Sequence, residues 1–392
     1  MMRTAVDADV LIAGGGLAAQ RCCETLRRGG FNGRIVVLCD EPRAPYDRPA
    51  LSKAVLLGER EVSTLAYREP RWYEEHEIEL LLGTAARALD ATAHVVELQD
   101  GSRVRYGQLL IATGSRPRPS PLFGSSERVH ELRTAADAQA LRDTFASSSG
   151  ELAVIGAGLI GLEVASAARA LGMKVTVIEV APTPLARALP PALGLWIAGL
   201  HREHGVDVRL ATAVEAVEHG PHDVQMKLSD GSQVTAETVL LAVGTVPATE
   251  WLTSSGLGPG AIHVDAGGRT QLPDVYAAGD AACYPGSHPE QRVPTQHWEA
   301  AARQGATAAR SLLGQEPLPA PPSMFWSDQH GRRIQLVGHS PDGCHVELDG
   351  DPAASDFIAW LTHTELPPAA MLVNRPDALP QARARIAASH PN

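Results

Sequence analysis

Two short segments of the sequence carry glycines at a spacing that lets a backbone turn bind a phosphate group. The first reads GGGLAA and the second reads GAGLIG, and each follows an apolar run. The spaced positions are Gly14, Gly16 and Ala19 in the first segment and Gly156, Gly158 and Gly161 in the second. The first position permits a tight turn, the second lets backbone amides approach a pyrophosphate, and the small third residue lets helix and strand pack closely. The spacing therefore predicts two dinucleotide-binding turns.

Each turn lies between a predicted buried strand and a predicted helix, and an acid follows the next strand. The predicted strand, helix and strand are 10–13, 20–28 and 34–38 in the first copy and 152–155, 162–171 and 174–178 in the second. Asp40 follows the first copy and Glu179 ends the second. An acid about 20 or more residues after such a turn accepts hydrogen bonds from ribose hydroxyls. Because Glu179 would repel a 2′-phosphate, we expect the second site to favour NADH over NADPH.

Two further segments, 109–114 and 240–244, resemble each other and indicate how the domains are connected. Each is an apolar strand that ends in a glycine, Gly114 or Gly244, with a proline soon after. We interpret them as the two crossings between a first domain and a second domain inserted into it. The predicted fold class is α/β, with two Rossmann-like dinucleotide-binding domains and a small α+β C-terminal domain.

The predicted boundaries follow from these crossings and from a proline-rich stretch at 317–322, which reads as a stiff linker. The first domain is discontinuous and the second is continuous. The predicted domains are 1–117 with 246–320, then 118–245, and then 321–392. In the last domain we expect strands near 333–337 and 344–348 and a helix from about Ala378.

Composition and charge argue against several other classes of protein. The 392 residues have a formal net charge of −11, which gives no basic footprint for nucleic acid. No segment approaches the roughly 20 apolar residues that cross a bilayer, and the N-terminus reads as a strand entering a turn rather than a signal peptide. The five cysteines form no CxxC pair and no metal-ligand spacing. We expect a reduced, cytoplasmic chain without a metal site.

The order of motifs resembles that of the FAD-dependent ferredoxin reductases, the reductase components of haem monooxygenase and aromatic-ring dioxygenase systems. The motifs are GGGLAA, PYDRPALSK, IATGSRP, GAGLIGLE, LAVGTVP, VYAAGDAA, HWEAAARQG, FWSDQ and VNRP. The resemblance implies FAD on the first domain and NADH on the inserted domain. It assigns FAD contacts to Gly14, Ala18, Asp40, Lys53, Ala86, Arg133, Asp280 and Trp298, with Arg48 as a further cofactor-binding residue. For Asp280 the alternative is a cap on the helix that follows.

In glutathione reductase-like enzymes, the stretch after the first acid carries a redox-active cysteine pair beneath the flavin. Here that stretch, 45–53, contains no sulfur, so electrons cannot pass to a local disulfide. We hypothesise that Lys53 lies near the reactive edge of the flavin and pairs with Glu163, which reaches toward the nicotinamide. The alternative is that Lys53 is a surface residue and Glu163 is a carboxylate at a helix start.

Electrons must then leave the flavin singly to a separate protein, because the chain has no ligand set for an iron–sulfur cluster. The resemblance places the exit near Trp298 and Trp326 and implies a small acidic [2Fe-2S] ferredoxin as partner. We predict a basic docking rim, the alternative being scattered solvated arginines. The rim would include Arg303, Arg310, Arg332 and Arg333. A helix starting near Trp298 would aim its N-terminus at the reduced flavin, or would serve packing alone.

The leading prediction is an NADH-dependent ferredoxin reductase that serves a monooxygenase or dioxygenase, as a monomer or homodimer. One alternative is an NADH oxidase or peroxidase, which usually needs a reactive cysteine near the flavin. Another is a redox sensor similar to apoptosis-inducing factor, in which NADH binding changes dimerisation.

Overall fold

The computed structural model describes residues 6–147, 150–285, 296–340, 343–364 and 366–389. Contacts within the chain divide it into two compact units, each assembled from separate segments. The first unit consists of the segment that ends at Asp47, together with Leu65–Arg116 and Val246–Ala320. The second unit consists of Arg48–Thr64, Pro117–Thr245 and the segment that begins at Pro321.

The first unit is built on a seven-stranded sheet in the order β3-β2-β1-β6-β5-β4, with β18 also paired to β6. Strands β1, β2, β3, β6 and β18 are parallel, and β4 and β5 add an antiparallel hairpin. The strands are β1 (Val6–Ala13), β2 (Ile35–Cys39), β3 (Ile78–Leu82), β4 (Ala86–Asp90), β5 (Val95–Leu98), β6 (Arg103–Ile111) and β18 (Val275–Ala277). Val10 and Ile12 pack in one apolar cluster, and Leu11 and Ala13 pack in another. Both faces of the second half of β1, 10–13, are therefore covered, which agrees with the unbroken apolar run there.

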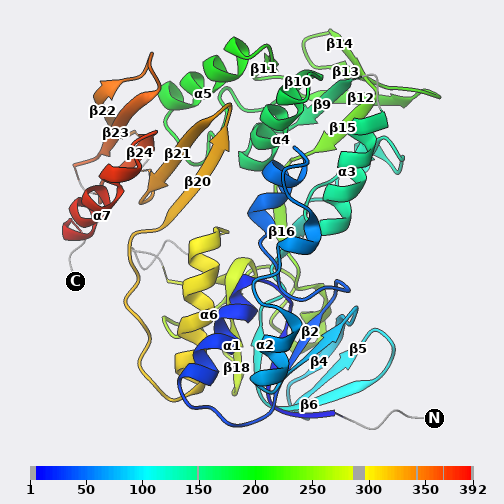
Figure 1. Cartoon of the computed structure of the whole chain (residues 1–392), viewed down its shortest axis with the longest axis vertical. Coiled ribbons are helices and arrows are strands. Elements are labelled where there is room, and N and C mark those ends of the chain that lie inside the picture. The colour runs from blue at the N-terminus through cyan, green and yellow to red at the C-terminus, as the bar shows by residue number, and fades with distance from the viewer. Residues whose placement is uncertain (1–5, 148–149, 286–295, 341–342, 365, 390–392) are drawn as a thin grey trace. The chain divides into compact units, whose positions relative to one another are not determined.

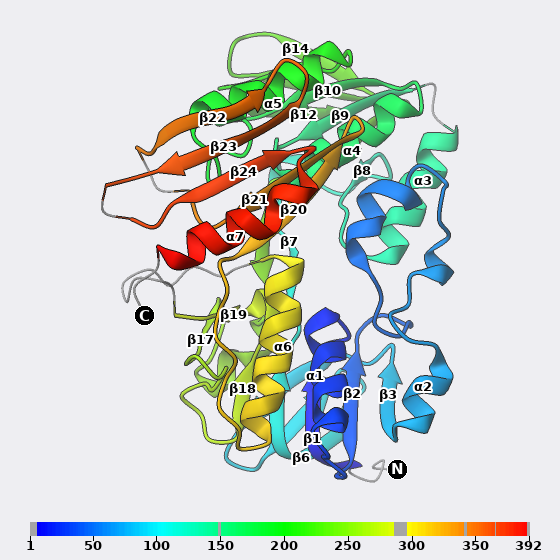
Figure 2. The same cartoon turned by 60° about the vertical axis from the view of Figure 1, so that its left-hand side comes forward.

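Helices α1 (Leu17–Arg28) and α6 (Trp298–Leu312) lie side by side against this sheet (Figures 1 and 2). Their contact is close because both helices present small residues. A Cβ added at Gly305 would overlap the backbone carbonyl of Ala18. Both helices were predicted, α1 with a later start. Shorter elements complete the unit: α2 (Pro70–Glu75), β17 (Ile262–His263), β19 (Ala282–Cys283) and the 3-10 turn η5 (Glu250–Ser255).

The second unit contains a five-stranded parallel sheet in the order β11-β10-β9-β15-β8. Its strands are β8 (Val129–His130), β9 (Glu151–Ile155), β10 (Lys174–Ile178), β11 (Asp207–Arg209) and β15 (Thr238–Leu241). Its helices are α3 (Ala135–Ser147), α4 (Leu159–Ala170) and α5 (Pro191–Glu203). The antiparallel strands β12 (Val214–His219), β13 (Val224–Leu228) and β14 (Gln233–Ala236) form a separate meander. The core repeats the order of the first unit, with the strand before the glycine turn near the centre.

The same unit includes an antiparallel sheet in the order β20-β21-β24-β23-β22, with helix α7 packed on β21 and β24. Its elements are β20 (Met324–Gln329), β21 (Arg332–Val337), β22 (His345–Asp351), β23 (Asp356–Thr362), β24 (Ala369–Val373) and α7 (Leu379–Ala388). Strands β21 and β22 and helix α7 lie where the sequence predicted a strand or helix, whereas β20 and β23 were not predicted. The fold class is confirmed.

Residues 48–64, which the prediction assigns to the first domain, fold with the second unit. The helical turn η2 (Leu51–Val55) packs on α3 and α4 there, and Leu51 and Val55 are buried. This apolar contact explains the placement. Among the described residues, no helix is both long enough and apolar enough to cross a membrane.

Candidate functional site

The first glycine turn joins β1 to α1 in the geometry that its spacing predicts. Gly14 has a φ of +120°, and a Cβ there would overlap the carbonyl of Ala112, so only glycine fits. Among the described residues, no atom lies within 4 Å of the Cβ position at Gly16. Ala19 is fully buried against the sheet. The turn therefore exposes backbone at its second position and packs tightly at its third.

A pocket of about 240 Å³ lies beside this turn. Gly14, Asp40 and Ala86, three of the predicted FAD contacts, line it together with Thr113. Asp40 is exposed at the end of β2, and one carboxylate oxygen accepts a hydrogen bond from the backbone N–H of Glu41 at 3.0 Å. The carboxylate keeps capacity for further donors, such as ribose hydroxyls. The residues that line this pocket fit one of the two nucleotide halves of FAD.

Asp280 and Trp298, two further predicted FAD contacts, also belong to the first unit. Asp280 accepts a hydrogen bond from the Ser115 hydroxyl at 2.8 Å. Since α6 begins only at Trp298, Asp280 does not cap that helix. The indole N–H of Trp298 donates to the Asp47 carboxylate at 3.0 Å and to the Tyr67 hydroxyl at 3.1 Å. These bonds fix the orientation of the ring.

The second glycine turn joins β9 to α4 and repeats the first. Gly156 has a φ of +105°, and its Cβ would overlap the carbonyl of Ala242. A Cβ at Gly161 would overlap the carbonyl of Gly156, so alanine does not fit here as it does at the first turn. At Gly158 the nearest atom to a Cβ lies 4.0 Å away. Gly244, with a φ of +99°, follows two residues after Ala242. The crossing segments thus supply the carbonyl that closes each turn.

Glu179 lies at the end of β10, where an acid that binds ribose was predicted. One of its oxygens accepts the backbone N–H of Ala157 at 2.6 Å, and the other accepts that of Ala181 at 2.7 Å. Ala157 is part of the glycine turn. The carboxylate is therefore held beside the turn in a fixed orientation, with lone pairs left for a ribose hydroxyl.

Lys53 and Glu163 form an ion pair within the second unit, so the predicted pairing is confirmed. The Lys53 ammonium lies 2.8 Å from a Glu163 carboxylate oxygen, and the two side chains are 20% and 6% exposed. Lys53 also donates to the carbonyl of Pro49 at 3.3 Å. Glu163 accepts further hydrogen bonds from Ser52 at 2.5 Å and Ser327 at 2.7 Å. The alternative of a lone surface lysine is wrong.

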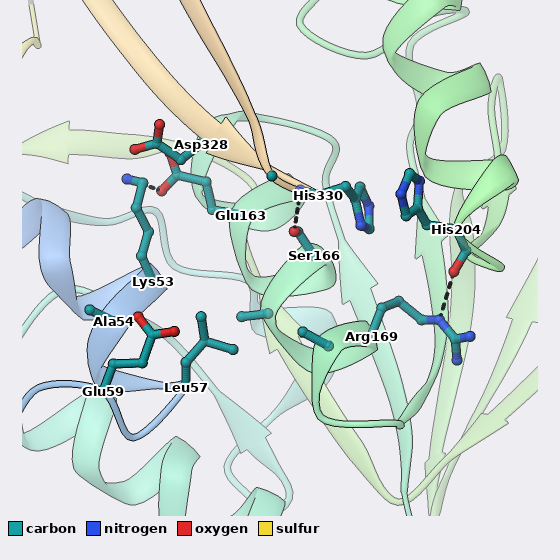
Figure 3. Close-up of a pocket in the computed structure, with 13 residues that line it drawn as sticks. Lys53, Ala54, Leu57, Glu59, Glu163, Ser166, Arg169, His204, Asp328 and His330 are labelled. Carbon is teal, nitrogen blue, oxygen red and sulfur yellow. Dashed lines mark hydrogen bonds and ion pairs between the residues drawn. The ribbon is translucent and has the colours of Figure 1, made fainter. Parts of the chain in front are cut away.

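Both serines were missed at the sequence level. Ser52 immediately precedes Lys53, and Ser327 lies in the motif FWSDQ, which the sequence analysis connected with electron exit. The ion pair lies at one end of a pocket of about 470 Å³. Figure 3 shows Lys53 and Glu163 on one side of this pocket and His330 and His204 on the other.

Arg48 and Arg133 lie close together in the second unit, where the Arg48 guanidinium donates to the backbone carbonyl of Arg133 at 2.8 Å. These two residues and Lys53 are therefore in one unit, whereas Gly14, Asp40, Ala86, Asp280 and Trp298 are in the other. Their common role in binding one cofactor stays a prediction.

The four arginines of the predicted rim are divided between the units. Arg303 and Arg310 belong to α6, and Arg332 and Arg333 belong to β21. The Arg333 guanidinium lies over the ring of Trp326, 5.7 Å from its centre, and pairs with Asp328 at 3.4 Å. Arg333 itself is exposed and Trp326 is half-buried, so the guanidinium is the part of this pair that an acidic protein can contact. Docking at this rim stays a prediction.

None of the five cysteines forms a disulfide. Cys22, Cys23, Cys39 and Cys283 are buried, and burial raises the pKa of the Cys23 and Cys39 thiols to about 12. Such thiols form very little thiolate near neutral pH and are poor nucleophiles. Among the described residues, no three His, Cys, Asp or Glu side chains are grouped as a metal site.

Comparison with known proteins gives matches along almost the whole chain. Residues 8–305 match the family described as pyridine nucleotide-disulphide oxidoreductase, and residues 324–391 match the one described as reductase C-terminal. The chain is 37% identical over 355 residues to the anthranilate 1,2-dioxygenase system ferredoxin–NAD(+) reductase component of Burkholderia cepacia, covering 89% of this chain and 86% of that protein. It is 36% identical over 332 residues to rhodocoxin reductase of Rhodococcus erythropolis, covering 84% and 78%.

The fold is also similar to that of a chain in a solved protein complex. In the crystal structure of the covalent putidaredoxin reductase–putidaredoxin complex, the matching chain has a TM-score of 0.92 and 32% identity. The match covers 98% of this chain and 94% of that one.

Proposed function

Since the chain belongs to the pyridine nucleotide-disulphide oxidoreductase family, we propose that it is the NADH-dependent ferredoxin reductase of an oxygenase system. The resemblance predicted from the order of the motifs is confirmed by these matches. The enzyme takes two electrons from NADH and delivers them singly to a [2Fe-2S] ferredoxin that serves a monooxygenase or dioxygenase. The observation that carries the proposal is the largely buried Lys53–Glu163 ion pair, whose lysine lies in a segment that has no thiol.

In this proposal the first unit supplies most of the FAD site. The backbone amide at Gly16 would bind the pyrophosphate, and the positive end of α1 would favour its charge. The Gly14 amide instead donates to the Leu38 carbonyl at 2.9 Å and helps to shape the turn. Asp40 accepts hydrogen bonds from the ribose, and Asp280 accepts them from the ribityl chain. Bound FAD supplies the conversion between two-electron and one-electron transfer.

The second unit supplies the NADH site. Gly158 would present its backbone amide to the pyrophosphate, as Gly16 would in the first unit. The Gly156 amide donates to the Ile178 carbonyl at 2.8 Å. Glu179 accepts a hydrogen bond from the ribose 2′-hydroxyl. Because two backbone amides already hold its carboxylate, Glu179 cannot swing away from a 2′-phosphate, and NADPH is disfavoured.

The ion pair orients the reacting partners. In this proposal Lys53 would present its ammonium to the reactive edge of bound flavin. Glu163, which fixes that ammonium, would reach toward the nicotinamide. Both groups are largely removed from water, so their interaction is strong and each depends on the other for compensation. The segment around Lys53 contains no cysteine that could form a disulfide and accept electrons from the flavin. The proposed electron acceptor is therefore a separate protein.

The acceptors of the isolated flavoprotein test the proposal. Under anaerobic conditions with NADH, we expect rapid turnover with a [2Fe-2S] ferredoxin and none with a disulfide substrate. In air, peroxide formation should be far slower than ferredoxin reduction. Faster peroxide formation would favour an oxidase, and turnover only with a disulfide would overturn the proposal.

Docking of the ferredoxin is tested by reversing one charge. Arg333→Glu should raise the KM for ferredoxin about tenfold at low salt and leave reduction of a small dye unchanged. Arg87, an exposed arginine of β4 paired with Glu97 at 3.3 Å, gives the matched control Arg87→Glu. If both substitutions raise the KM for ferredoxin equally, the arginine rim is not the docking surface.

We expect the protein to be a monomer or a homodimer, and sedimentation can distinguish the two.

A further inference from the structure

A chain of hydrogen bonds links Glu163 to two histidines that the sequence analysis did not single out. Ser327 donates its hydroxyl to Glu163 at 2.7 Å, and the Gln329 amide group donates to Ser327 at 2.9 Å. The other end of the Gln329 side chain lies 3.0 Å from Nε2 of His201. Nδ1 of His201 in turn lies 3.1 Å from Nε2 of His330. The chain therefore runs from the pocket wall to the carboxylate of the ion pair.

These groups come from different elements of the second unit and are shielded from water. His201 lies on α5 and is 0% exposed, while Ser327 and Gln329 lie two residues apart on β20 and are each 1% exposed. His330 lies in the turn between β20 and β21, and its backbone N–H donates to the Ser166 hydroxyl on α4 at 2.7 Å (Figure 3). Buried polar groups in this setting need complementary donors and acceptors.

The direction of every bond follows from the carboxylate, which can only accept. Ser327 must donate to Glu163, so its oxygen accepts from the amide nitrogen of Gln329, whose carbonyl oxygen therefore faces His201. His201 must then carry its proton on Nε2. When His201 is neutral, its Nδ1 is an acceptor, and His330 must donate from Nε2. One set of tautomers satisfies the whole chain.

The surroundings keep both histidines neutral. Burial lowers the pKa of His201 to about 4. Burial, together with His201, His204 and nearby arginines, lowers the pKa of His330 to about 3. A second proton on His201 would also place two N–H groups against each other at the 3.1 Å contact with His330.

We propose that His201 and Gln329 are positioning residues, which hold Glu163 through Ser327 in the orientation that pairs it with Lys53. The Nε2–H tautomer of His201 sets this orientation. The Nδ1–H tautomer would instead put the lone pair of Nε2 against the side-chain carbonyl oxygen of Gln329. This inference rests on the proposed function only for the step that it serves, the reduction of bound flavin by NADH. The hydrogen-bond chain itself exists without any cofactor.

The tautomers can be measured directly. In protein labelled with ¹⁵N-histidine, we expect His201 and His330 to give the signals of neutral Nε2–H imidazoles at pH 7. In Gln329→Met, His201 loses its acceptor and should shift toward a mixture of tautomers. A His201 imidazolium, or an Nδ1–H tautomer in the unaltered protein, would overturn the proposal.

Kinetics separate positioning from packing. His201→Leu has a similar volume but no polar groups, and should slow flavin reduction by NADH about tenfold, the equivalent of one buried hydrogen bond. His201→Gln can donate to Gln329 and accept from His330, so it should restore the rate to within about twofold. If the leucine variant reacts as fast as the glutamine variant, the side chain serves packing only and the proposal fails.

Two further variants keep the result interpretable. Gln329→Met breaks the chain at a second point and should slow the reaction to a similar extent, even if His201→Leu folds poorly. His219, which bonds the backbone carbonyl of Phe123 at 2.9 Å elsewhere in the unit, provides the control His219→Gln, which should react normally. FAD content is matched across all variants.

The outcomes distinguish this inference from the proposed function. If NADH reduces the flavin and Gln329→Met slows that step, the inference stands even when no ferredoxin is reduced. If NADH does not reduce the flavin of the unaltered protein, the proposed function fails, and the tautomer measurement alone decides the inference. The inference would be wrong if NADH reduced the flavin at the wild-type rate in both Gln329→Met and His201→Leu and the histidine tautomers were unchanged.

Discussion

The two glycine turns have the same backbone design, but the helices that follow them carry different chemistry. In each, the first glycine lies against the carbonyl of an alanine from a crossing segment, Ala112 or Ala242. Counting from the first glycine, Arg21 on α1 occupies the position that Glu163 occupies on α4. Arg21 pairs within its own helix, with Glu24 at 2.6 Å, whereas Glu163 pairs with Lys53 of a distant segment.

The neighbours of each helix explain this difference. Helix α1 packs on α6 through small residues such as Ala18 and Gly305, so that contact has no room for a long side chain. Helix α4 packs instead on η2 and β20, which bring Lys53, Ser52 and Ser327 to Glu163. The backbone of the two turns is therefore the same, and the partner of the helix determines which side chains meet behind the turn. In the proposed function, those side chains are what distinguishes the NADH site from the FAD site.

Replacing the first glycine of each turn should have the largest effect and should separate the two sites. In Gly14→Ala and Gly156→Ala, backbone strain and overlap with a carbonyl should together cost about 4 kcal/mol. Gly14→Ala should lose FAD, and Gly156→Ala should keep FAD but bind NADH weakly. Flavin absorbance and NADH titration measure both. Loss of FAD in both variants would break the proposed division between the turns.

Removing the charge that distinguishes the helices should have the next largest effect. Glu163→Ala leaves Lys53 without its partner and should cost about 3 kcal/mol of unfolding free energy. It should also slow flavin reduction by NADH about a hundredfold while FAD stays bound. Arg21→Ala, at the matching position of α1, should cost less than about 1 kcal/mol, because the partner Glu24 keeps Arg68 at 2.9 Å. Chemical denaturation and stopped-flow absorbance provide the values, and equal losses would contradict the comparison.

Mild acid should weaken the second unit before the first. The pKa of His201 falls from an ordinary value of about 6.5 to about 4 on burial. The unfolded chain therefore binds more protons between these values, and stability falls as the pH drops through that window, by about 3 kcal/mol at its lower end. Burial tends to raise the pKa of Glu24 in the first unit, but hydrogen bonds from Arg21, Gln20 and Arg68 lower it overall. Its contribution is lost only as the pH falls below the usual carboxylate range.

Hydrogen exchange at pH 7 and pH 5, corrected for intrinsic rates, tests this order. Amides of α5 should lose protection at pH 5 while those of α1 keep it. His201→Gln removes the titrating group and should reduce the difference. Loss of protection in α1 first would contradict the assignment.

The third position of the turns should give the smallest effect. Ala19→Gly should cost about 2 kcal/mol, from the lower helix propensity of glycine and the loss of one buried methyl group, since the backbone need not move. Gly161→Ala should cost more, because its Cβ would overlap the carbonyl of Gly156. Thermal unfolding of the two variants checks whether α4 lies closer to its strand than α1 does.

The sequence predicted those parts of the site that depend on local chemistry. Glycines and an acid at fixed spacing specify the turns, and Asp40 and Glu179 lie at the strand ends where they were expected. The pairing of Lys53 with Glu163 was predicted from the motif order and the absent thiols, and it is confirmed. In each case the signal lies within a short segment whose conformation has few alternatives.

The remaining groups could not be predicted because they meet only through tertiary packing. His201 and His330 are isolated residues whose neighbours depend on how α5 faces the turn after β20. A weak signal did exist for Ser327 and Gln329, which alternate along one strand and therefore face the same side. The placement of 48–64 also escaped prediction, because Leu51 and Val55 do not reveal which helices bury them.

The division of the chain into units has a consequence for biosynthesis. The backbone passes between the units five times, after Asp47, Thr64, Arg116, Thr245 and Ala320. During translation the parallel sheet around β1 lacks β18, and its covering helix α6 is missing, until most of the polypeptide has left the ribosome. The nascent N-terminal strands must wait with one apolar face only partly covered, by α1 and α2. No single proteolytic cut can release either unit as an intact fragment.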